Sequence, residues 1–167
     1  MGKFFLERRV LLGFCGSYTC TIDDKGRLSI PAKIRPGDPE KSKEKSIPSG
    51  DKLVVSQGLD GCLSLYPVDE WKKVQERLQS KSFTLRDFRY VNRRLHQYTS
   101  VEKIDKSGRI HLPEILRTQA GISKEVLVIG ANQTIEVWDP ERYHAYTENY
   151  GRSLEDVAEE LFKDDPD

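Results

Sequence analysis

The chain has 167 residues, of which 37% are hydrophobic and 32% charged, and its formal net charge is zero. That length suffices for one domain with a sizeable core, or for two small halves that share a core. No apolar run approaches the roughly 18 residues that a membrane-spanning helix needs. We therefore expect a polar, globular, cytoplasmic protein with no membrane partner.

Charge is unevenly distributed along the chain. Residues 139–167 contain ten acids and three bases, whereas residues 1–138 contain 24 bases and 17 acids, a net charge of +7. A basic body with an acidic tail suits a surface that binds a polyanion.

Motifs of catalysis and metal binding are missing from the sequence. The three histidines, His96, His111 and His144, share no metal-ligand spacing, and no G-x-S-x-G, P-loop or G-x-G-x-x-G is found. We therefore expect no enzyme, no catalytic residue, no metal and no cofactor. The cysteines, Cys15, Cys20 and Cys62, form no C-x-x-C and are predicted to be reduced and mostly buried.

The first half of the chain is predicted to contain a strand, a turn, a strand, a short helix, a hairpin and a helix. Residues 36–50 interrupt this order, and their Pro, Gly, Ser and charged residues predict a mobile loop. The predicted segments are strands at 17–22 and 27–30, a short helix from Pro31, hairpin strands at 53–57 and 62–66 with a four-residue connection, and a helix at 67–78.

The second half repeats the same order, with roughly 60 residues per copy. Its predicted segments are strands at 98–104 and 109–112, a helix at 113–120 stopped by Gly121, hairpin strands at 126–129 and 134–138 with another four-residue connection, and a helix from 139. An Arg-rich helix at 83–97 links the halves, and a further helix is predicted at 153–162 with Ser153 as its cap. The expected domains are 14–80, a linking helix at 81–97, 98–147, and a C-terminal helix with acidic tail at 148–167.

One stretch of 14 residues, 22–35, recurs 82 positions later at 104–117. Six of the 14 positions are identical, and three more keep an aliphatic residue. In each copy an aliphatic residue ends a strand, Asp opens a turn, Gly supplies a positive φ, Arg starts a second strand, and Pro opens a helix. The repetition predicts a two-fold arrangement of one surface.

The residue types of this motif suggest two different roles. Asp23 and Asp105 can accept backbone N–H bonds and, with Gly26 and Gly108, organise the turns. The arginines after them offer planar forks that suit phosphate oxygens or guanine. The candidate DNA-binding residues are Arg27, Arg109, Lys25, Lys33, Arg35 and Lys106; Lys103 and Arg117 lie nearby.

Simpler interpretations stay open for these residues. Each Asp could pair with its Arg only to hold the turn, which does not prevent the Arg from also reaching outward. Two symmetric Asp residues also suggest an aspartic protease, but such enzymes have Gly two residues after Asp, and here it follows three after. The Arg-rich segment 86–94 is more typical of a solvated or subunit-facing surface, and Trp71 and Trp138 of core or interface positions.

The doubled Asp-x-x-Gly-Arg, each followed by a short strand and Pro, resembles the MraZ family of bacterial transcriptional regulators. Residues 18–22, 62–71 and 129–138 are similar to the family's pattern as well, so the resemblance covers about residues 13–143. It implies an α+β, β-rich fold in which two AbrB-like swapped-hairpin units from one chain form a pseudo-two-fold barrel with flanking helices.

The resemblance also implies a function. The family's members are expected to form ring-like homo-oligomers, to associate with the nucleoid, and to bind short repeated sites in double-stranded DNA, in the promoter of the operon for division and cell-wall synthesis. The 36–50 loop and the acidic tail are longer than usual for the family, and Ser107 stands where the first copy has Lys25. The alternative is a ring-forming assembly scaffold that binds no nucleic acid.

Overall fold

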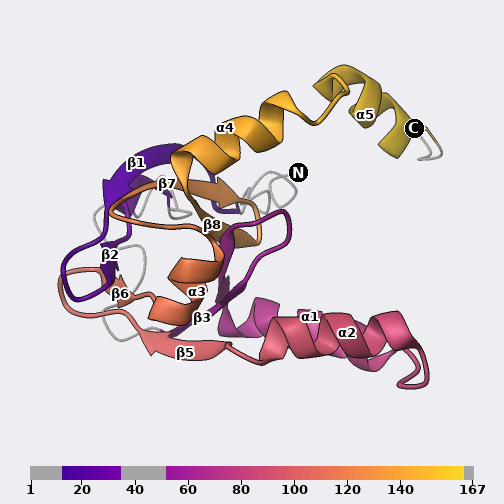
Figure 1. The fold of residues 1–167 in the computed structure, drawn as a ribbon, viewed down its shortest axis with the longest axis horizontal. Helices are drawn as coiled ribbons and strands as arrows, with labels where there is room; N and C mark the ends of the chain where they lie inside the picture. The colour runs from indigo at the N-terminus through magenta and orange to yellow at the C-terminus, as the bar shows by residue number, and fades with distance from the viewer. Residues whose placement is uncertain (1–12, 35–51, 164–167) are drawn as a thin grey trace, which may run out of the picture.

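A computed structural model describes residues 13–34 and 52–163, which form an α+β arrangement of antiparallel strands and helices (Figure 1). Arg35, the 36–50 loop and residues 164–167 of the acidic tail lie outside the described residues. The elements are β1 (Ser17–Thr21), β2 (Arg27–Ser29), η1 (Ala32–Ile34), β3 (Lys52–Gln57), β4 (Leu63–Pro67), α1 (Val68–Gln79), α2 (Arg86–His96), β5 (Ser100–Lys103), β6 (Arg109–His111), α3 (Glu114–Gln119), β7 (Glu125–Ala131), β8 (Thr134–Trp138), α4 (Pro140–Glu148) and α5 (Leu154–Leu161).

The main sheet has six strands in the order β1-β7-β8-β4-β3-β5. The predicted hairpins are confirmed, since β3 pairs with β4 and β7 with β8, both antiparallel. The strand before each motif joins the hairpin of the other half, because β1 pairs with β7 and β5 pairs with β3. The two halves therefore build one sheet together.

The pairings among the described strands make an open sheet and a separate ribbon. The strands β1 and β5 lie at the two edges of the main sheet, and β2 pairs with β6 in a ribbon of two strands. The expected closed barrel is therefore not formed by these pairings, although a bridge between Ile22 and Leu28 connects the β1 segment to the ribbon.

One hydrophobic core joins the ribbon to the main sheet. Leu28 and Ile110 of the ribbon are completely buried, together with Val55, Leu65 and other aliphatic residues of the main sheet. Alternate residues of β7 and β8 point into this core, as the period of a half-buried strand requires. Buried residues from both halves of the chain therefore form a single core.

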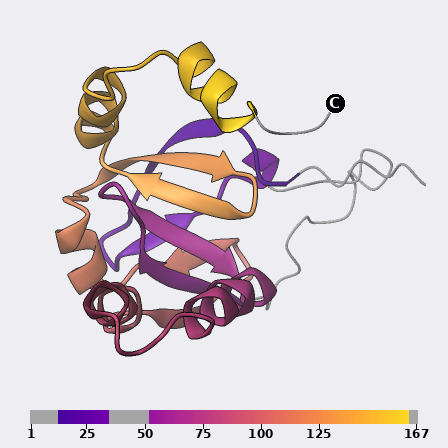
Figure 2. The same cartoon turned by 90° about the vertical axis from the view of Figure 1, so that its right-hand side faces the viewer.

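Helices cover the sheet on two sides. The pair α1–α2 lies along β3, where the Ser56 hydroxyl donates to the Leu95 carbonyl at 2.9 Å, and α4 and α5 lie at the opposite side of the molecule (Figure 2). Covered on both faces, β3 has four consecutive buried residues. None of the helices in the described part of the chain is long and apolar enough to cross a membrane.

Local signals in the sequence predicted several helix ends correctly. Gly121 follows α3 with a φ of +65°. The Ser153 hydroxyl accepts the N–H of Asp156 at 3.1 Å at the start of α5. Trp71 and Trp138 are buried, at 6% and 2% exposure, and each packs against other aromatic rings.

Three local predictions were wrong. Five residues, 58–62, separate β3 from β4, and only two, Asn132 and Gln133, separate β7 from β8, where four were expected in each hairpin. The short second turn is possible because Asn132 adopts a φ of +63°, a conformation that Asn tolerates better than most residues. Only Cys62 of the three cysteines is buried; Cys20 is half-buried, and Cys15, just before β1, is exposed.

Candidate nucleic-acid interface

The first motif is a tight turn held by a single carboxylate. One oxygen of Asp23, Oδ1, accepts the backbone N–H of Lys25 at 3.0 Å and that of Arg27 at 2.9 Å. The main chain closes the same turn, since Gly26 N–H donates to the Asp23 carbonyl at 2.9 Å. Gly26 has a φ of +75°, which favours glycine.

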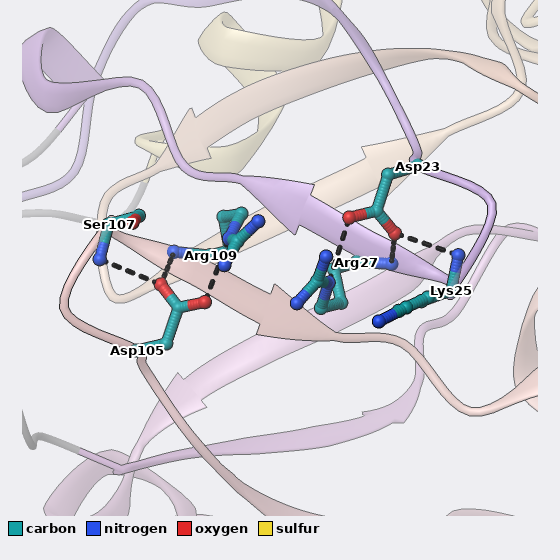
Figure 3. A network of polar contacts seen from close by, with 6 residues as sticks. All are labelled: Asp23, Lys25, Arg27, Asp105, Ser107 and Arg109. Carbon is teal, nitrogen blue, oxygen red and sulfur yellow. Dashed lines mark hydrogen bonds and ion pairs between the residues drawn. The ribbon is translucent and has the colours of Figure 1, made fainter.

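The second motif has the same geometry. Asp105 Oδ1 accepts the N–H groups of Ser107 and Arg109, both at 2.9 Å, and Gly108 has a φ of +76°. The predicted turn-organising role of the two Asp and two Gly residues therefore agrees with the hydrogen bonds in both copies (Figure 3).

Each Asp also orients its Arg. In both motifs the Arg Nε donates to the second carboxylate oxygen, Oδ2, at 2.8 Å. Among the contacts of the described residues, the terminal guanidinium nitrogens of Arg27 and Arg109 donate no hydrogen bond. The side chains are about one-third exposed, at 31% and 34%. The Asp–Arg pair that holds each turn therefore leaves the terminal guanidinium nitrogens available for another hydrogen-bond acceptor.

These contacts lower the pKa of both Asp carboxyl groups. For Asp23 the backbone N–H of Arg27 has the largest effect, which outweighs the opposing effect of partial desolvation, and the Arg27 side chain and the Lys25 N–H add to it. The pKa of Asp105 is lowered in the same way by Arg109 and Ser107. Both carboxyl groups are therefore ionised, and each Arg stays paired, at neutral pH.

The two arginines share one face of the β2–β6 ribbon. Arg27 lies opposite His111 in the antiparallel register, and Arg109 lies opposite Ser29. The residues between them, Leu28 and Ile110, are buried on the other face. Since side chains alternate along a strand, both arginines point away from the core. The two Asp turns lie at opposite ends of the ribbon (Figure 3).

Each turn is also bound to the strand of the other motif. The Leu112 N–H donates to the Gly26 carbonyl at 2.8 Å, and the Ile30 N–H donates to the Gly108 carbonyl at 3.0 Å. These reciprocal bonds follow a pseudo-two-fold axis through the ribbon. They hold both arginines on one rigid platform.

Other basic residues lie around this platform. Lys25 and Lys106 are exposed within the two turns, and Lys33 is exposed on η1, beyond the end of β2. Arg117 is held close to the first turn, since its Nε donates to the Leu112 carbonyl at 3.0 Å. Its guanidinium also covers the first turn, because a Cβ added to Gly26 would lie 3.0 Å from Arg117 Nη2.

Sequence reasoning missed two residues on the face of the β2–β6 ribbon that carries Arg27 and Arg109, here called the arginine face. Ser29 and His111 are both exposed, and they stand at pseudo-equivalent positions opposite the two arginines. His111 Nδ1 also lies 3.8 Å from the Glu102 carboxylate of β5. The alternation of the short strands was the signal that could have placed both residues beside the arginines.

The described residues contain no group of three or more His, Cys, Asp or Glu side chains that could hold a metal ion. Each motif Asp, in addition, uses both oxygens on its own turn and arginine. The separate ion pairs leave no shared carboxylate pair of the kind that aspartic proteases need.

Fold and site together define an internally duplicated α+β protein that presents two Asp-oriented arginines on one ribbon. Its sequence matches the family model for the MraZ protein in two segments, residues 14–94 and 97–165. The chain belongs to the MraZ family.

Relatives of the same family come from several bacteria, and each is named transcriptional regulator MraZ. The chain is 40% identical to the protein of Heliobacterium modesticaldum over 148 residues, which cover 89% of this chain and 96% of the relative. It is 38% identical to that of Syntrophomonas wolfei, with the same coverage. Identity to the Limosilactobacillus reuteri protein is 37% over 146 residues, or 87% of this chain and 95% of the relative.

Proposed function

We propose that this chain is a sequence-specific DNA-binding transcriptional regulator whose reading surface is the outer face of the β2–β6 ribbon. The observation that carries the proposal is the pair of arginines on that face, each fixed by an Asp at 2.8 Å through Nε. A guanidinium held in this way keeps its terminal nitrogens for a bidentate contact with guanine or phosphate. The names of the relatives support the same role.

The dimensions of DNA also favour the ribbon. The major groove of B-DNA is about 12 Å wide and admits a two-stranded β-ribbon, and several repressors read bases in this way. In this proposal Arg27 and Arg109 contact base edges. Lys25, Lys33, Arg35 and Lys106 contact phosphates and supply the salt-dependent part of the affinity.

Repeated DNA sites suit a protein that binds as an assembly of several identical chains. One chain offers few contacts, and several linked chains on neighbouring sites increase the affinity through effective concentration. We therefore propose action as a homo-oligomer, such as a ring, on repeats in the promoter of the division and cell-wall operon, in the cytoplasm and at the nucleoid. The exchange of strands between the two halves supports the AbrB-like swapped-hairpin relationship.

The test is DNA binding to the gene's own upstream promoter region, by fluorescence anisotropy across a salt series. Arg27→Ala and Arg109→Ala are each expected to weaken binding by about 1–3 kcal/mol and to relax sequence preference. Lys25→Ala is expected to weaken binding to all sequences alike and to reduce the salt slope by about 1. Lys72→Ala, on the exposed side of α1, is the matched control.

Two results would contradict this proposal. Wild-type affinity in both arginine variants, with unchanged circular dichroism, would remove the ribbon as the reading surface. Absence of any salt-dependent preference for promoter DNA in the wild type would favour the assembly scaffold without a nucleic-acid role.

A further inference from the structure

One histidine stands between the arginines of the proposed reading surface. His111 is the last residue of β6, and the register places it directly opposite Arg27 and two residues after Arg109. Alternate residues of a strand share a face and lie about 7 Å apart, and directly opposite residues have Cβ atoms about 5 Å apart. His111 therefore lies within reach of any ligand that contacts both arginines.

The imidazole of His111 is held at one edge and accessible at the other. Its side chain is 48% exposed, and its Nδ1 lies 3.8 Å from a carboxylate oxygen of Glu102. Glu102 belongs to β5, which packs against β6, and its side chain is only 23% exposed. Among the contacts of the described residues, Nε2 of His111 makes no hydrogen bond. This nitrogen is therefore available to a ligand on the arginine face.

Three charged groups face His111, from the two strands beside β6 and from β6 itself. Glu102 on β5 favours the protonated ring, because opposite charges attract. Arg27 on β2 and Arg109 on β6 oppose protonation, but each is paired with its own Asp at 2.8 Å, which reduces its field. Attraction and repulsion therefore offset each other in part, and an added negative charge at this face favours the protonated ring.

The two protonation states of His111 offer DNA different chemistry. A neutral imidazole has one N–H donor and one acceptor nitrogen, whereas the protonated ring has two donors. When the neutral ring directs its N–H at Glu102, Nε2 is an acceptor and cannot bind a phosphate oxygen or the O6 and N7 of guanine. The protonated ring places a charged donor at the same position, and charged donors form the stronger hydrogen bonds.

We infer that His111 is a third DNA contact of the arginine face and that it makes this contact in its protonated form. The inference rests on the proposed function, since it requires DNA on the ribbon. DNA binding then takes up a proton wherever the free ring is neutral, so affinity falls as the pH rises through the range in which histidine titrates, about pH 5 to 8. Ser29, the pseudo-equivalent residue opposite Arg109, has no such charge.

The test measures affinity for the promoter duplex by fluorescence anisotropy at constant ionic strength. The wild type is expected to bind about three- to tenfold more weakly at about pH 8 than at about pH 6, because one charged hydrogen bond is lost. His111→Gln is uncharged at every pH and should show the weak, high-pH affinity throughout. His111→Lys is charged at every pH and should keep the strong, low-pH affinity throughout.

The neighbouring carboxylate gives a second readout. In Glu102→Gln the ring loses the charge that attracts its proton, so the change in affinity should move to lower pH. A third readout is the proton NMR signal of the His111 ring. Because the coupling of two binding equilibria is reciprocal, DNA should raise the pH at which this ring titrates in the wild type.

The matched control is His144→Gln on α4. His144 is also exposed and also lies beside a carboxylate, with its Nε2 3.3 Å from Glu148, but it is not on the ribbon. This variant should keep both the affinity of the wild type and its dependence on pH. Circular dichroism at each pH confirms that each variant is folded.

Two results would overturn this inference alone, provided that Arg27→Ala and Arg109→Ala still weaken binding. The first is an affinity of His111→Gln that depends on pH as steeply as that of the wild type, and the second is a titration of the His111 ring that DNA does not shift. Wild-type affinity in both arginine variants would instead remove the ribbon as the reading surface, and this inference with it.

Discussion

At the scale of single residues, the Asp of each motif has two functions that its two oxygens keep separate. Oδ1 accepts backbone N–H groups and shapes the turn, and Oδ2 accepts the Arg Nε and aims the guanidinium. The sequence motif predicted both roles, because Asp before a Gly-containing turn and Arg after it are specific in type and spacing. It could not place Arg117 across Gly26, because that contact joins residues from different halves.

The lowered pKa of Asp23 and Asp105 predicts how stability depends on pH. Because the folded-state pKa lies below the unfolded value of about 3.9, the unfolded chain binds more protons between the two values. The stabilisation is complete above the unfolded pKa and is lost as the pH falls through the folded pKa. We expect the thermal midpoint of the wild type to fall in acid more steeply than that of Asp23→Asn/Asp105→Asn.

The measurement is thermal unfolding by circular dichroism from about pH 7 to about pH 3, the range in which such carboxyl groups titrate. Asp24→Asn is the control, because Asp24 is an adjacent exposed carboxylate with no hydrogen bond among the described residues. Its thermal midpoint should fall with decreasing pH as steeply as that of the wild type. If the thermal midpoint depends on pH equally steeply in the wild type and in the double variant, the two turns do not contribute to acid sensitivity.

At the scale of elements, the β2–β6 ribbon is short, yet it joins the site to the core. Leu28 and Ile110 face each other in the register and have no exposed surface, directly behind the two arginines. The sequence predicted two short strands here. It could not predict that they pair with each other, because strand partners far apart in the chain are chosen by packing and not by local propensity.

Truncation of a ribbon core residue should therefore destabilise the whole protein. Leu28→Ala and Ile110→Ala are each expected to lower the free energy of unfolding by about 2–5 kcal/mol, because each leaves a cavity. Urea denaturation followed by circular dichroism measures the change. Ser29→Ala, exposed on the opposite face of the same strand, is the control and should change stability by less than about 0.5 kcal/mol. A similarly small change for Leu28→Ala would mean that the ribbon is not coupled to the core.

At the scale of the whole molecule, the repeat in the sequence does not correspond to two separate domains. The strands β1 and β5 each pair with a hairpin from the other half, and one core serves both. The duplication and the order of elements were readable from the sequence, because local patterns repeat. The exchange of strands was expected only from the family resemblance, since hydrophobic alternation does not identify a partner strand.

A shared sheet predicts that the halves unfold together. The chain has two tryptophans, Trp71 in the first half and Trp138 in the second. In Trp138→Phe, fluorescence reports on the first half alone, and in Trp71→Phe on the second half alone. Within each variant we expect the fluorescence and circular dichroism transitions in urea to coincide, as two-state unfolding requires. A fluorescence midpoint that differs from the circular dichroism midpoint in either variant would indicate two independent units.

The arginine face has a further consequence, because its two halves are not identical. Arg27 lies opposite His111, Arg109 lies opposite Ser29, and Lys25 in one turn corresponds to Ser107 in the other. A homodimer of identical subunits must present the same residues on both sides of its axis. A single duplicated chain is not bound by this symmetry, so its two copies of the motif can differ in sequence. The fold therefore gives the ribbon a polarity, so that one orientation of the chain along a double helix differs chemically from the reverse.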